Sequence, residues 1–158
     1  MPNHNALGIA NELIDLSGHR MAQMKLQKLV YLSHAWNLAI NQQPLVMDPI
    51  LAWDNGPVIQ RIWNHIRDWG YNCEKTYFGD PRNDNRIVAD ITDEERLVIN
   101  HVWGKYGVYS GRHLSELTHQ PGTPWTNAYF RHGRNSRLSN DEIQQHITEL
   151  AIAGRRAD

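Results

Sequence analysis

Two lysines are the residues whose type and spacing stand out first in this sequence. Lys25 and Lys28 lie three positions apart within residues 21–40, a segment that is otherwise largely apolar. On a helix this spacing puts both ammonium groups on one side, among apolar neighbours. A charge in such surroundings needs a carboxylate, a carbonyl group or water. Two interpretations stay open: either the lysines are paired within the chain, or they face a groove where another molecule supplies the partner.

Acid–base catalysis would need a histidine beside a carboxylate. His113 and Glu116 are three positions apart on one predicted helix face, and His119 follows them. Such a pair would suit a small hydrolase, but it is more often local surface electrostatics. The sequence contains no GxSxG, GxGxxG or P-loop motif. We therefore predict no catalytic residue and no enzyme, and keep a hydrolase as the weakest alternative.

Metal and redox chemistry have little support. None of the nine histidines shows HxxxH or HExxH spacing. The single cysteine, Cys73, has no partner for an internal disulfide, and we interpret it as a small buried hydrophobic residue. These features predict no bound metal, no cofactor and a cytoplasmic protein.

The most basic local run contains Arg131, Arg134 and Arg137. A solvated connection between two helices would explain it, and contact with an acidic partner surface or a phosphate backbone is the alternative. The whole chain carries 16 lysines and arginines against 17 acidic residues, so no strong overall field favours nucleic acid or an anionic membrane. We expect this run to form the edge of a protein interface.

Helices are the elements that must position these residues. Residues 21–40 are apolar around most of a helical circumference, which predicts a buried central helix. Capping signals at Thr92, Thr123 and Ser139 predict further helix starts. The predicted helices cover about residues 5–16, 21–40, 57–69, 93–106, 111–119, 124–129 and 140–153.

Strand signals are weaker. Residues 44–53 contain two prolines and no helical period, with short strands expected at Leu45–Val46 and Ile50–Trp53. The next turn, Gly56-Pro57, is interpreted as the start of a helix with proline at its first position. Residues 71–91 resemble two extended segments around a polar loop, which makes them a candidate hairpin.

The length and composition favour a single domain. The chain has 158 residues, 41% of them hydrophobic, and no linker-like stretch divides it. No window approaches the roughly 18 apolar residues of a membrane span. We predict one domain over residues 1–158: a mainly α, compact fold of six or seven helices around a central buried helix, with at most a small β-hairpin.

Three blocks of sequence carry a family resemblance. They are MKLQKLVYLSHAW (24–36), PLVMDPILAWDNGPVIQRIW (44–63) and YGVYSGRHLSELTHQPGTPW (106–125). The blocks resemble the signature of the Panacea domain, the antitoxin domain of the SocA-like family, whose prophage relatives are often labelled phage-associated proteins. Residues 6–16 also resemble the N-terminal helix of that family, so the resemblance covers residues 6 to about 130.

The resemblance implies a mainly helical antitoxin that binds a protein toxin encoded by a neighbouring gene and neutralises it without a catalytic step. One branch of the family acts instead as an adaptor that hands its toxin to a protease, which gives a second hypothesis. The positions that match family motifs are Lys25, Gln27, Lys28, Gly56, Pro57, His119, Pro124 and Trp125.

The partner surface is expected where the Gly56-Pro57 turn and the lysine side of the central helix form one groove. The residues predicted to bind the partner are Lys25, Lys28, Trp53, Asn55, Arg131 and Arg134.

Overall fold

The computed structural model describes residues 4–18, 21–69 and 77–157. Within these ranges the chain forms seven helices and one two-stranded hairpin, so the predicted fold class is confirmed. The helices are α1 (Ala6–Ser17), α2 (Gln23–Asn41), α3 (Gln60–Trp69), α4 (Asp93–Tyr106), α5 (Gly111–Thr118), α6 (Pro124–His132) and α7 (Asn140–Ala157). The strands are β1 (Ile50–Trp53) and β2 (Gly56–Ile59).

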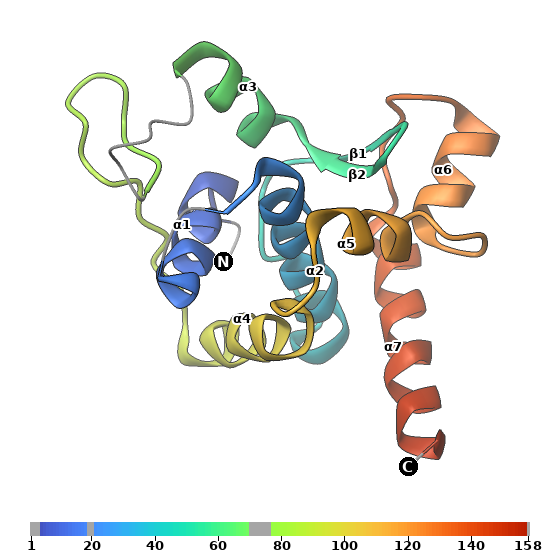
Figure 1. Ribbon diagram of the computed structural model, residues 1–158. Coiled ribbons are helices and arrows are strands. Elements are labelled where there is room, and N and C mark those ends of the chain that lie inside the picture. The colour runs from blue at the N-terminus through green and yellow to red at the C-terminus, as the bar shows by residue number, and fades with distance from the viewer. Residues whose placement is uncertain (1–3, 19–20, 70–76, 158) are drawn as a thin grey trace.

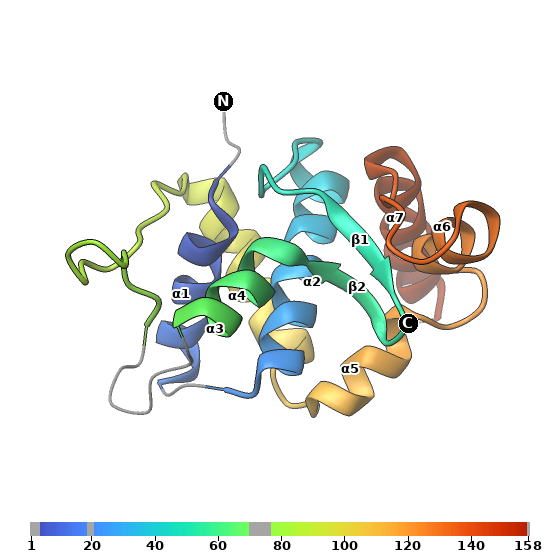
Figure 2. The ribbon, with the colours of Figure 1, turned by 90° about the horizontal axis from the view of Figure 1, so that it is seen from above.

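Helix α2 is the centre of the fold. Every residue from 26 to 38 is buried, which explains why apolar side chains occupy most of its circumference. The helix contacts α1, α4, α5, α7 and β2. Figure 1 shows it in the middle of the molecule with the hairpin near its upper end, and Figure 2 shows it between α1 and α4 on one side and α7 on the other.

The hairpin departs from one prediction. Strand β1 lies where a short strand was expected, and it pairs antiparallel with β2 so that Trp53 lies opposite Gly56. Pro57 belongs to β2, and α3 begins at Gln60, so the prediction of Pro57 at the first helical position is wrong. The local sequence is compatible with a helix start at Pro57, but tertiary contacts decide otherwise. Side chains of α2 form hydrogen bonds with the backbone of β2 and hold that backbone extended.

The other predicted strands are only partly present. The strand predicted at Leu45–Val46 is absent, and Val46 forms only a single β-bridge, with His4. In the region predicted as a second hairpin, the described residues 77–91 contain one bridge, between Gly79 and Arg86. The remainder of that region, including Cys73, lies outside the described residues.

Apart from that of α3, the predicted helix starts lie within two residues of the observed ones. Thr92 and Glu95 form a complete capping box at α4, and Thr123 caps α6 with Pro124 in its first turn. Ser110 caps α5. Along the described ranges, no helix is long and apolar enough to cross a bilayer.

Candidate partner-binding groove

A groove of about 410 Å³ lies between the N-terminal part of α2, the hairpin turn and α3. Three residues predicted to bind a partner, Lys28, Trp53 and Asn55, line it, and Arg134 from the loop after α6 lines it as well. We call this the hairpin groove. Its other lining residues are Gln23, Met24, Gln27, Asp54, Val58 and Trp63.

Lys28 is the buried charge of the hairpin groove. Its side chain is 2% exposed, and its Nζ donates a hydrogen bond to the carbonyl oxygen of Pro57 at 2.9 Å. Burial lowers the pKa of Lys28 to about 8, because the charged form loses its water. Within the described ranges, no carboxylate forms an ion pair with this amine.

Gln27 and Gly56 fix the hairpin against α2. The Nε2 of Gln27 donates to the carbonyl oxygen of Ile59 at 3.0 Å, and its Oε1 accepts from the Ile59 amide at 2.9 Å. Gly56 has φ +115, a backbone conformation that residues with a side chain rarely adopt. A Cβ at this position would lie 3.3 Å from the Nζ of Lys28. These family-motif positions therefore have a structural role in holding the hairpin beside the amine.

The motif residues of α5 and α6 hold the hairpin from its other side. The Nε1 of Trp125 donates to the carbonyl oxygen of Trp53 at 2.7 Å. Pro124 is the first residue of α6 and so places Trp125 in the first helical turn. His119 donates through Nδ1 to the carbonyl oxygen of Ser115, and its ring meets that of Trp125 edge to face at 5.2 Å. Figure 2 shows the hairpin turn near α5 and α6.

Charged groups at the hairpin turn neutralise one another. Asp54 accepts a hydrogen bond from the Tyr129 hydroxyl at 2.8 Å and one from the Nε of Arg134 at 3.1 Å. Both interactions lower the pKa of Asp54, the Tyr129 hydrogen bond most strongly. The guanidinium of Arg134 is thus already paired within the chain.

Aromatic side chains form much of the remaining wall. The rings of Trp53 and Trp63 meet edge to face with centroids 5.6 Å apart, and the Nε1 of Trp53 donates to Asn135 at 2.9 Å. Met24 is 38% exposed on the same groove. Indole rings held in place beside a flexible methionine are typical of protein-binding surfaces.

Lys25 and Arg131 lie outside the hairpin groove. The Nζ of Lys25 donates to the carbonyl oxygen of Gly107 at 2.7 Å and lies 5.6 Å from the ring centroid of Trp103. Gly107 is the C-terminal cap of α4, where the helix dipole attracts a cation. The expectation that both lysines share one groove is therefore wrong. Arg131 is exposed on α6 and does not line the groove.

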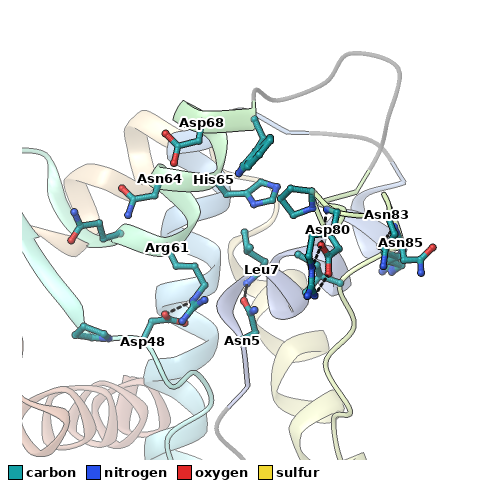
Figure 3. Close-up of a pocket in the computed structure, with 17 residues that line it drawn as sticks. Asn5, Leu7, Asp48, Arg61, Asn64, His65, Asp68, Asp80, Asn83 and Asn85 are labelled. Carbon is teal, nitrogen blue, oxygen red and sulfur yellow. Dashed lines mark hydrogen bonds and ion pairs between the residues drawn. The ribbon is translucent and has the colours of Figure 1, made fainter.

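A larger cleft, about 940 Å³, lies between α3, the start of α1 and residues 80–87 (Figure 3). Its charged side chains are paired: Arg61 contacts Asp48 at 2.5 Å, and Arg82 contacts Asp80 at 2.8 Å. Burial lowers the pKa of His65, which also lines this cleft. Because these arginines already have carboxylate partners, they offer little to a charged ligand.

The pair considered for acid–base catalysis does not converge. His113 stacks on Tyr109 with ring centroids 4.4 Å apart, while Glu116 lies 3.7 Å from the Nε of Arg112. Both His113 and Glu116 are exposed. In the part of the chain that the structure describes, no group of three or more histidine, cysteine or acidic side chains is arranged to hold a metal ion.

The chain matches a known protein family. The family described as Antitoxin SocA-like, Panacea domain, matches residues 26–126, which is more than half of the 158 residues. The matched range contains α2 from Leu26 onward, the whole hairpin and the start of α6, so it includes most of the hairpin groove. No curated protein and no solved structure matched the chain.

Proposed function

Because the chain belongs to the family of SocA-like antitoxins with a Panacea domain, we propose that it binds a protein toxin directly and keeps it inactive. The family match carries this proposal. The toxin is expected to be the product of a neighbouring gene, and neutralisation needs no catalytic step by the antitoxin. We further propose that the hairpin groove is the main contact surface for the toxin.

The character of the groove supports this choice of surface. Trp53 and Trp63 are half-buried and held by neighbouring groups, so they would lose little side-chain freedom on binding. The start of α5 lies beside Met24, because a Cβ on Gly111 would lie 3.3 Å from the Cβ of Met24. Met24 is 38% exposed and lines the groove with the two indole rings. An exposed apolar side chain beside aromatic rings favours an interaction surface.

Growth of cells that express the neighbouring gene, with and without this protein, tests the proposal. We expect expression of the neighbour to stop growth, co-expression to restore it, and the two proteins to co-purify as a stable complex. A harmless neighbour, or toxicity that this protein does not change, would contradict an antitoxin function. The half-life of the toxin should be measured in the same cells, because a shortened half-life would identify an adaptor that delivers the toxin to a protease.

The contact surface is tested separately with matched tryptophan variants. Trp63→Ala removes one wall of the groove, whereas Trp69→Ala removes a tryptophan that is 62% exposed at the end of α3 and does not line the groove. We expect Trp63→Ala to weaken toxin binding by about tenfold or more and Trp69→Ala to leave it nearly unchanged. If both variants change toxin binding equally, the hairpin groove is not the main contact surface.

A further inference from the structure

The hairpin groove carries one charge that its other residues leave uncompensated. Its charged lining residues are Lys28, Asp54 and Arg134, and the last two pair with each other at 3.1 Å. Among the described residues, the hydrogen-bond acceptor of the Lys28 amine is a backbone carbonyl, that of Pro57. The groove therefore keeps one net positive charge, and this charge lies at a buried position.

A buried, unpaired ammonium group lowers the stability of the free protein. Removing an ammonium group from water is unfavourable unless an opposite charge and further hydrogen bonds replace the water. Burial alone lowers the pKa of Lys28 to about 8, and no opposing contribution from a nearby carboxylate offsets it. An apolar side chain of similar length would fill the same position without this cost.

The backbone around the amine leaves room for it. A side chain at Gly56 would come within 3.3 Å of the Nζ and 3.4 Å of the Cε of Lys28. The two hydrogen bonds between Gln27 and Ile59 hold the adjoining strand in place. The amine is thus kept at a fixed position beside the groove before any partner binds, and this preorganisation favours binding.

We propose that the hairpin groove accepts a glutamate side chain of the bound protein, with the carboxylate on the amine of Lys28 and apolar neighbours of that glutamate against Trp53, Trp63 and Met24. This inference rests on the proposed function and specifies the chemistry of the toxin segment. A glutamate carries its carboxylate on a thin two-carbon stem that reaches a recessed amine. A chain-terminal carboxylate would bring the backbone of the last residue with it, and the tight surroundings of Lys28 disfavour that bulk.

Binding of synthetic peptides to the full chain tests the inference without the toxin. The probes are capped seven-residue peptides with a central glutamate flanked by leucine or phenylalanine, and the same peptides with a central glutamine. We expect the glutamate peptides to bind about tenfold or more tightly than their glutamine counterparts, measured by calorimetry, because the new hydrogen bond joins two charged groups. Equal affinities, or no binding of any peptide, would overturn the inference.

Two variants assign the preference to one amine. Lys28→Met should abolish the preference for glutamate, while Lys25→Met should keep it, because the Lys25 amine contacts the Gly107 carbonyl outside the groove. Circular dichroism and urea unfolding accompany both variants. If Lys28→Met does not fold, the comparison of glutamate with glutamine peptides on the native chain still decides the inference. A folded Lys28→Met protein that keeps the preference would refute it.

The two proposals fail in different ways. A native chain that captures and neutralises the toxin but shows no preference for glutamate peptides would leave the antitoxin function standing and remove the role of Lys28. A chain that prefers glutamate peptides but neither captures nor neutralises the neighbouring gene product would retain the acidic-peptide site and remove the antitoxin function.

Discussion

Gln27 joins the central helix to the hairpin through both ends of its amide. The Nε2 and Oε1 atoms bond to the carbonyl oxygen and the amide of Ile59 at 3.0 and 2.9 Å, and both residues are buried. In a Gln27→Leu variant these two backbone groups would be buried without partners. Unsatisfied buried groups cost about 1–3 kcal/mol each, so we expect the free energy of unfolding in urea to fall by about 2–6 kcal/mol.

Gln145→Leu provides the matched control for this prediction. Gln145 is an exposed glutamine of α7, and its Nε2 contacts Glu149 at 3.2 Å. A surface substitution of this kind should change the free energy of unfolding by less than about 0.5 kcal/mol. If both variants lose the same stability, the amide of Gln27 does not hold the hairpin.

Lys25 and Lys28 show how much can be predicted from the sequence for single residues. Their spacing predicted amines among apolar neighbours, with an internal partner or a groove as the alternatives. In the structure both amines bond to carbonyl groups distant in sequence, Lys25 to Gly107 and Lys28 to Pro57, and only Lys28 also lines a groove. No local pattern could separate the two, because the acceptors belong to other elements whose positions depend on tertiary packing.

Helix ends are the most predictable features at the scale of elements, because their signals are local. The N-caps of α4 and α6, Thr92 and Thr123, were both predicted from a few neighbouring residues. Strand β2 was missed for the opposite reason. Its Gly56-Pro57 start is compatible with a helix, and its extended backbone depends on pairing with β1 and on bonds from α2.

The α4 capping box also connects two distant parts of the chain. The Oγ1 of Thr92 accepts from the amide of Glu95 at 3.1 Å, and the Oε1 of Glu95 accepts from the amide of Thr92 and from the Nε2 of His4. Removing the cap in Thr92→Ala should lower the free energy of unfolding by about 1 kcal/mol in thermal denaturation. Thr92→Ser keeps the acceptor oxygen and should lose much less; equal losses would mean that packing of the methyl group matters instead.

The scale of the whole molecule combines predictable and unpredictable features. The apolar circumference of residues 21–40 was sufficient to predict a helical fold around a buried centre. The hairpin groove was only partly predictable, since its walls come from α2, the hairpin, α3 and the loop after α6. The sequence analysis placed Lys28, Trp53 and Asn55 in one groove, and all three line it. Trp53 and Asn55 belong to the hairpin turn, and Lys28 belongs to the helix that packs against the hairpin. Trp63 and Met24 also line the groove but were not predicted to do so. Each lies in a run of apolar residues at helical spacing, and such a run is equally typical of a residue in the core.

His34 links three parts of this packing. Its Nδ1 accepts hydrogen bonds from the amides of Leu45 and Val46 at 3.1 and 3.2 Å, and its Nε2 donates to the Oδ1 of Asn140 on α7 at 3.0 Å. An imidazole that accepts at one nitrogen and donates at the other is neutral. Burial lowers the pKa of His34 below its ordinary value of 6.5, so the folded protein resists the protonation that would remove the acceptor.

This arrangement predicts a loss of stability in mild acid. Because the pKa is lower in the folded state, the unfolded chain binds the proton first as the pH falls below about 6.5. The stabilisation is complete above that value and declines below it, by up to about 1.4 kcal/mol per pH unit for this single group. Urea unfolding between about pH 7.5 and 5.5 measures the decline. His65 and His146 have pKa values lowered by burial and act in the same direction, so a His65→Gln, His146→Gln double variant removes their contribution. We expect that variant to keep most of the decline, and a flat profile would show that His34 is not the group that links stability to pH.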